Sequence, residues 1–125
     1  IDTSADTSHP DLARSSITQA NFAGQRGQRG KETHGTAVVG LIAAKPDSPQ
    51  GMSGLANEAN VHLLRGCWQN VNGKGACNTL TLALAFDAAI DLQPDVLKFN
   101  RSLRQNAGSA AGGFAQQKYA GCCCL

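Results

Sequence analysis

The chain has 125 residues, of which 42% are hydrophobic and 16% are charged, and its formal net charge is +2. This length corresponds to one domain or a piece of one, large enough to bury a core. The small net charge gives no reason to expect binding to nucleic acid or to an anionic membrane. No apolar run reaches the roughly 18 residues that a membrane-spanning helix requires. The chain starts at Ile1, without an initiator methionine or a signal peptide, as expected for a segment of a longer protein.

The first residues, IDTSADTSHPDL, repeat Asp-Thr-Ser ahead of a His-Pro turn. Either this is a polar loop, or one aspartate is a working group at the end of a strand and the remainder is the turn around it. Residues 24–31, GQRGQRGK, form a basic and RGG-like cluster. Since no aromatic residue is interleaved for base stacking, a solvated loop is the preferred interpretation of this cluster.

Residues 33–44, THGTAVVGLIAA, are almost wholly apolar after the histidine and end at Lys45-Pro46. This pattern predicts a buried helix. Thr33 is the predicted N-cap, which places His34 in the first turn.

Further along, residues 60–68 alternate and predict a strand, and residues 69–78 predict a turn. Residues 80–91 have helical periodicity, with Leu80, Leu84 and Ala88 on one face, and residues 95–100 are a strand candidate. Helices that alternate with strands indicate a parallel α/β sheet. From Arg101 onward no clean period remains, and a loop or irregular tail is predicted.

Three histidines are candidates for the base of a nucleophilic hydrolase, which also needs a buried acid to orient that base. His9 lies in a polar turn and His62 inside an alternating strand, so structural roles are expected for both. His34 lies at the mouth of an apolar helix, where a ring can face a cleft. Spacing alone leaves open whether His34 is functional or structural.

Two motifs together resemble the subtilisin-like serine peptidases, or subtilases. THGTAVVGLIAA resembles their histidine motif, and IDTSADTSHPDL resembles their Asp-Thr/Ser-Gly motif followed by His-Pro-x-Leu. GMSGLANEANVHLL and AIDLQPDVLKFNRSL resemble two further family segments, in the family's order. The resemblance covers most of residues 1–103. It implies an α/β fold with a partial parallel sheet and flanking helices, followed by an irregular tail at residues 104–125.

The resemblance assigns catalytic roles to Asp2 and His34. Asp2 would accept a hydrogen bond from His34 and stabilise its protonated form, and Asp6 would belong to a variable turn. Ser102 and Leu103 match the family's substrate-binding edge.

The family's serine nucleophile, in Gly-Thr-Ser-Met-Ala, is absent from the 125 residues. Neither Ser53 in GMSG nor Ser109 in AGSAAGG is expected to replace it. The resemblance therefore implies a fragment of a serine endopeptidase that acts on proteins or peptides, secreted or periplasmic in the intact parent. The alternative is a non-catalytic pseudo-enzyme or an α/β protein-interaction module.

Three other features bear on the site. Ser4 replaces the glycine that the family usually has after Asp-Thr, which predicts a slightly altered strand end. Asp11 matches a position that binds calcium as a structural ion in some members, whereas a solvated turn aspartate is the alternative; no cofactor is required. Cys67 follows a predicted strand and Cys77 precedes a predicted helix, and we expect a disulfide between them in an exported parent.

Overall fold

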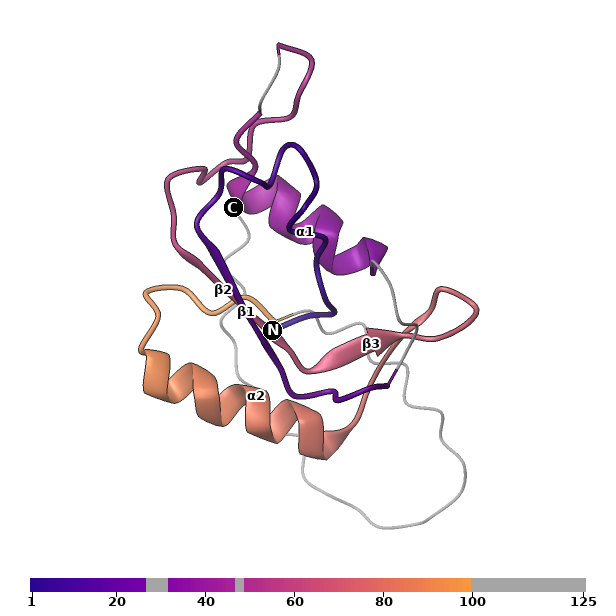
Figure 1. The fold of residues 1–125 in the computed structure, drawn as a ribbon. Coiled ribbons are helices and arrows are strands. Elements are labelled where there is room, and N and C mark those ends of the chain that lie inside the picture. The colour runs from indigo at the N-terminus through magenta and orange to yellow at the C-terminus, as the bar shows by residue number, and fades with distance from the viewer. Residues whose placement is uncertain (27–31, 47–48, 100–125) are drawn as a thin grey trace.

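The structure is a computed structural model, and it describes residues 1–26, 32–46 and 49–99. Its elements in these ranges are β1 (Ile17–Asn21), α1 (Thr33–Ala43), β2 (Val61–Arg65), β3 (Cys67–Gln69), β4 (Gly75–Cys77) and α2 (Thr79–Leu92). Strands β1 and β2 lie side by side and pair in parallel, whereas β3 and β4 form an antiparallel hairpin (Figure 1). The predicted α/β class with a partial parallel sheet is confirmed.

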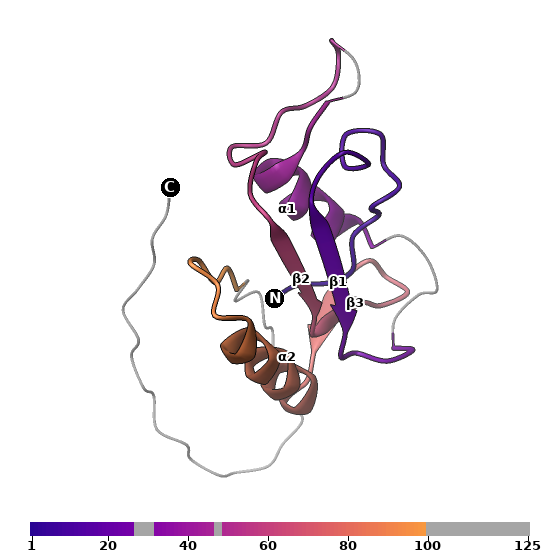
Figure 2. The same cartoon turned by 60° about the vertical axis from the view of Figure 1, so that its left-hand side comes forward.

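Two consecutive residues of β2 anchor cores on opposite faces of the parallel sheet, because side chains alternate along a strand. Leu63 packs in a cluster with Val39 of α1, and Leu64 packs in another with Ala85 and Ala89 of α2. Helices α1 and α2 accordingly cover different sides of the sheet (Figure 2). The sheet is thus a single layer between two helices, as in α/β proteins generally.

Helix α1 begins at Thr33, so the predicted boundary is close, but the predicted N-cap is wrong. Glu32 occupies the N-cap position, and its side chain makes no capping bond. The amide of Thr33, one of the donors that a helix start leaves without an intrahelical partner, donates to Oε1 of Gln69 at 2.6 Å. A residue of β3 therefore satisfies the helix end, which leaves the Glu32 carboxylate available for other partners.

Helix α2 is fixed by its first turn. Asn78 caps the helix by accepting from the amide of Thr81 at 2.8 Å, and the hydroxyl of buried Thr81 donates to the Gly66 carbonyl at 2.6 Å. The buried stripe consists of Thr81, Ala85 and Ala89. It is displaced by one position from the apolar face at Leu80, Leu84 and Ala88, because small side chains permit a closer approach to Gly66.

The observed strands differ from the predicted ones in four places. The predicted strand at 60–68 is interrupted at Gly66, and the predicted turn at 69–78 contains the second half of the β3–β4 hairpin. β1 was not predicted, since four of its five residues are exposed and give no alternation of burial. Residues 95–99 form no strand, and Asn100 lies outside the described residues.

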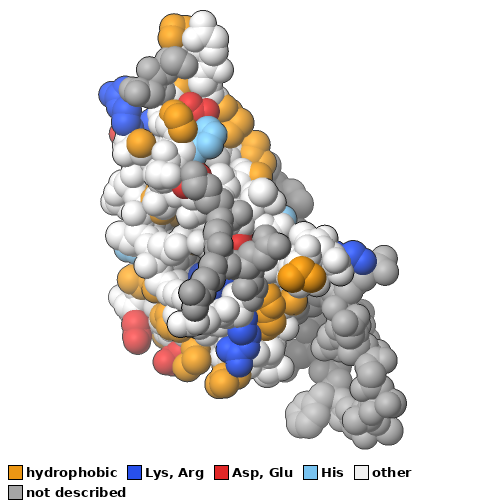
Figure 3. All heavy atoms as spheres, turned by 45° about the vertical axis from the view of Figure 1, so that its right-hand side comes forward, with side chains coloured by type: hydrophobic (Ala, Val, Ile, Leu, Met, Phe, Trp, Pro, Cys, Tyr) orange, Lys and Arg blue, Asp and Glu red, His pale blue; other side chains and the backbone are white. Residues whose placement is uncertain are grey.

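In the ranges that the structure describes, no helix has both the length and the apolar character needed to cross a membrane. On the face shown in Figure 3, hydrophobic side chains are spread between polar ones.

Candidate active site

Asp2 lies beside the end of β2, where two backbone hydrogen bonds hold it. Its amide donates to the Leu64 carbonyl and its own carbonyl accepts from the amide of Cys67, both at 3.2 Å. Asp2 also forms an isolated parallel bridge with Arg65. Only 4% of the Asp2 side chain is exposed, so its carboxylate depends on protein donors for its stabilisation.

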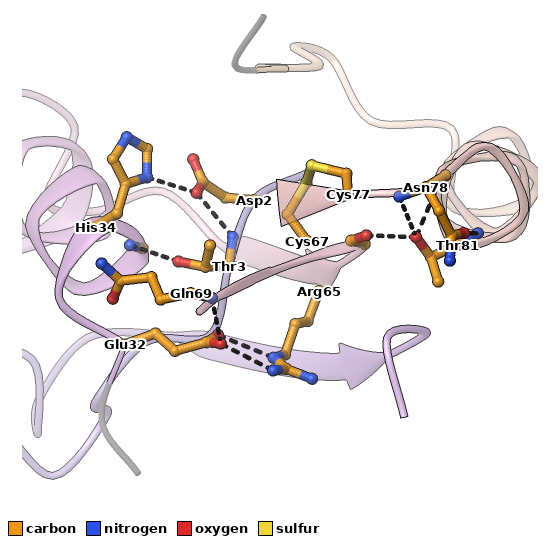
Figure 4. The surroundings of a disulfide bond; sticks show 12 residues. Asp2, Thr3, Glu32, His34, Arg65, Cys67, Gln69, Cys77, Asn78 and Thr81 are labelled. Atoms are coloured by element: carbon orange, nitrogen blue, oxygen red, sulfur yellow. Dashed lines mark hydrogen bonds and ion pairs between the residues drawn. A yellow bond between two sulfur atoms is a disulfide. The ribbon is translucent and has the colours of Figure 1, made fainter. Parts of the chain in front are cut away.

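The Asp2 carboxylate and the His34 ring are in direct contact. Oδ1 of Asp2 lies 2.7 Å from Nδ1 of His34 and accepts from the amide of Thr3, also at 2.7 Å (Figure 4). Oδ2 of Asp2 accepts from Nζ of Lys98 at 3.0 Å. Burial raises the pKa of Asp2, but the hydrogen bonds from Thr3, Lys98 and His34 outweigh burial and hold this pKa below its ordinary value. The carboxyl group is therefore ionised at neutral pH.

The ionised carboxylate determines which nitrogen of the His34 ring carries the proton. A carboxylate only accepts hydrogen bonds, so Nδ1 of His34 is the donor in this contact. The neutral ring then has its basic lone pair on Nε2, on a side chain that is 42% exposed. An oriented base with a buried acid behind it can take a proton from a hydroxyl and return it to a leaving group.

Further hydrogen bonds join the loop after Asp2 to the first turn of α1. The amide of Gly35 donates to Oγ1 of Thr3, and the amide of Asp6 donates to Oγ1 of Thr36, both at 2.9 Å. A Cβ on Gly35 would collide with the carbonyl oxygens of the two residues that follow Asp2. Glycine at this position therefore permits the close approach that brings His34 to the carboxylate.

A buried ion pair lies beneath these contacts. The Glu32 carboxylate accepts from Nε of Arg65 at 2.9 Å and from Nη2 at 2.8 Å, and the two side chains are 2% and 8% exposed (Figure 4). The same carboxylate accepts from the amides of Ser4 and Gln69. Burial raises the pKa of Glu32, and the bonds from Arg65, Ser4 and Gln69 outweigh burial and lower it. Glu32 thereby connects the Asp2 loop, the start of α1, β2 and β3.

Strand β3 runs past both halves of the site and is closed into its hairpin by a disulfide. Cys67 and Cys77 are bonded, with their Cα atoms 4.3 Å apart. Cys67 donates its amide to Asp2, and Gln69 contacts both Glu32 and Thr33. The disulfide therefore braces the strand to which the aspartate and the histidine helix are both attached.

Other candidates lie away from this pair. Oδ2 of Asp11 accepts from the amide of Met52 at 3.1 Å, and no group of three or more His, Cys, Asp or Glu residues in the described ranges could hold a metal ion. His9 accepts from the amide of Asp11, and His62 bonds to Thr18. Ser53 accepts from Asn57 in an exposed loop. The predicted substrate-edge residues Ser102 and Leu103, together with Ser109 and the predicted tail at 104–125, lie outside the described residues.

Three residues that contact the site were missed by sequence reasoning. Glu32 and Arg65 are 33 positions apart, and Lys98 lies 96 positions from Asp2. A charged residue inside the apolar run VHLLR was a usable signal for Arg65, because a buried arginine requires a partner. Nothing local in the sequence distinguishes Lys98 from a solvated lysine.

The comparisons with known proteins identify the family of the chain. The Major intracellular serine protease of Bacillus subtilis (strain 168) is 43% identical over 72 residues, which cover 52% of this chain and 22% of that protein. The chain thus spans about a fifth of the length of this curated relative. The model of the subtilase family matches residues 1–117. The chain belongs to the subtilase family of peptidases.

Proposed function

We propose that this chain supplies the acid–base half of the catalytic site of a serine endopeptidase. The observation that carries the proposal is the 2.7 Å contact between Oδ1 of Asp2 and Nδ1 of His34, in a chain that belongs to the subtilase family. The nucleophile would be a serine outside these 125 residues. Proteins or peptides would be the substrates, and no cofactor would be required. Calcium at Asp11 remains a proposal for a structural ion only.

The chemistry would be acyl transfer in two stages. Nε2 of His34 takes the proton from the serine hydroxyl as its oxygen attacks the peptide carbonyl, and then gives this proton to the leaving amine. Water repeats the sequence in the second stage and releases the acyl group. Asp2 keeps its own negative charge throughout and stabilises the imidazolium of His34 while it exists.

A fluorophosphonate probe, which reacts with an activated serine, tests the proposal. We expect no covalent adduct on the 125-residue chain, because Asp2 and His34 alone provide no nucleophile. We expect stoichiometric labelling of a longer protein that contains this segment, and loss of that labelling on His34→Ala. Labelling of the short chain at Ser53 or Ser109 would refute the assignment. An unlabelled but folded longer protein would instead favour the non-catalytic interaction module.

We also propose that the parent protein works in an oxidising compartment, secreted or periplasmic. The Cys67–Cys77 bond supports this proposal, because structural disulfides are rare in reducing cytosol. The relative from Bacillus subtilis carries the word intracellular in its name, which describes that protein. Trapping of thiols in intact cells is the test: alkylation of both cysteines before any reduction would contradict an oxidising location.

A further inference from the structure

The second carboxylate oxygen of Asp2 has a partner that the proposed acid–base pair does not use. Oδ1 faces His34 and the amide of Thr3, whereas Oδ2 lies 3.0 Å from Nζ of Lys98. Lys98 comes from the segment that follows α2, whereas His34 belongs to the first turn of α1. The two oxygens are thus held by groups from different segments of the chain.

The contact differs from an ordinary surface ion pair. Lys98 and His34 are each 42% exposed, but the carboxylate between them is only 4% exposed. In the pair between Lys45 and Glu58, by contrast, the carboxylate is 86% exposed. A hydrogen-bonded ammonium on a buried carboxylate is screened far less by solvent than an exposed pair. Lys98 therefore has both the position and the electrostatic strength to affect Asp2.

We propose that Lys98 is a positioning residue of the acid–base pair: it holds Oδ2 of Asp2 so that Oδ1 faces His34, and it partly compensates the carboxylate charge. The proposal rests on the proposed function, in which Asp2 orients the base. Without Lys98, the carboxylate can rotate about its last bond, since the remaining donors both act on Oδ1. The negative charge of Asp2 is then stabilised only by the two donors on Oδ1, which are the amide of Thr3 and Nδ1 of His34.

Several charged or titratable groups from different segments of the chain lie near Asp2. His34 approaches from α1 and Lys98 from the segment after α2, and the amino group of Ile1 interacts electrostatically with Asp2 and Lys98. Beside the β2 end, Glu32 and Arg65 compensate each other through their own ion pair. Among these cations, Lys98 is the side chain whose removal changes the field at Asp2 without removing the proposed base.

Removal of the lysine charge has a predictable sign. An ammonium beside a carboxylate favours the ionised form, so Lys98→Met raises the pKa of Asp2. Lys98→Arg keeps the cation and a donor within reach, and leaves this pKa close to that of the parent chain. Lys45→Met makes the same chemical change at an exposed pair and serves as the matched control.

The test is an NMR titration of the 125-residue chain carrying ¹³C-labelled aspartate, with Asp2 assigned from the Asp2→Asn spectrum. We expect Lys98→Met to raise the Asp2 titration midpoint and to broaden the Nδ1–H resonance of His34. Lys98→Arg should restore both signals, and Lys45→Met should change neither. Amide spectra establish that each variant is folded, and Lys98→Gln replaces Lys98→Met if the latter unfolds.

An unchanged Asp2 midpoint in the neutral variants would overturn the proposal, as would a Lys98→Arg variant that shifts as far as Lys98→Met. Neither readout requires a nucleophile. A failed lysine effect is therefore distinguishable from a failure of the peptidase assignment, which the fluorophosphonate experiment tests separately.

Discussion

Breaking the ion pair between Glu32 and Arg65 should be among the most damaging single changes outside the apolar core. In Arg65→Met, the Glu32 carboxylate loses the Nε and Nη2 donors and keeps the amides of Ser4 and Gln69. An ionised group that is 2% exposed would then be short of two charge-assisted bonds. Removal of one partner from such a buried pair costs about 3–5 kcal/mol, because the other charge stays buried.

The loss should depend on pH in a definite direction. In the parent chain the pKa of Glu32 lies below its ordinary value of 4.5, so the pair contributes its full stabilisation above that value. The contribution is lost as the pH falls through the lower, folded-state pKa. In Arg65→Met burial prevails and the pKa of Glu32 rises, so acidification neutralises the carboxylate and relieves the penalty. The difference between the two proteins should therefore be largest near pH 7. It should shrink as the pH falls through the raised pKa of Glu32 in the variant, and shrink further below 4.5, where the parent chain loses its own stabilisation.

Urea unfolding followed by circular dichroism, at pH 7 and again near pH 4, measures both effects. Lys45→Met is the control: it breaks an exposed pair, and we expect a loss below about 1 kcal/mol. The double variant Glu32→Gln with Arg65→Met should recover part of the loss, because the buried charge is gone. A loss for Arg65→Met no greater than the control, or one that grows on acidification, would refute the reasoning.

Three further changes separate the parts of the site. In a longer, active protein, Asp2→Asn should lower kcat by about 10⁴-fold, as in other serine peptidase triads, while Asp6→Asn should leave it nearly unchanged; equal losses would contradict the assignment. Replacing Cys67 and Cys77 by serine should lower the free energy of unfolding by about 2–3 kcal/mol, and reduction of this bond in the parent chain should cause a similar loss. Gly35→Ala should destabilise the chain and weaken the Nδ1–H resonance of His34, because the added methyl group collides with the carbonyl oxygens of Thr3 and Ser4. An unaltered spectrum would show that the loop after Asp2 moves to accommodate the methyl group.

The sequence predicted best what local chemistry determines. The apolar run after His34 marks α1 almost to the residue, and the periodicity before Pro94 marks α2. The contact between Asp2 and His34, 32 positions apart, is the hydrogen bond that the resemblance of the two motifs implies. Each motif carries its own pattern of hydroxyl, glycine and apolar residues, so each is recognisable without knowledge of the other.

What the sequence could not provide is pairing between distant charges. Glu32 directly precedes the predicted helix, and no local pattern shows that its carboxylate binds Arg65. Lys98 looks like one polar residue in a strand candidate, yet its ammonium reaches Asp2. Such contacts depend on the register of β2 and on the path of the chain after α2, and no periodic pattern in the sequence encodes either of them. The burial of Thr81 was equally hidden from the sequence, because it depends on a hydrogen bond from its hydroxyl to the carbonyl of Gly66, which is distant in the chain.

The neighbouring positions of Leu63 and Leu64 have a consequence for how the protein opens. One dipeptide of β2 serves the cluster that holds α1 and also the cluster that holds α2. Local detachment of either helix exposes the strand that the other helix needs, so the two halves cannot exchange with solvent independently. Backbone amides of α1 and α2 should therefore show the same opening free energy in hydrogen exchange and should converge on a single denaturant dependence. His34 on α1 and Lys98 beyond α2 would therefore leave Asp2 in the same opening event.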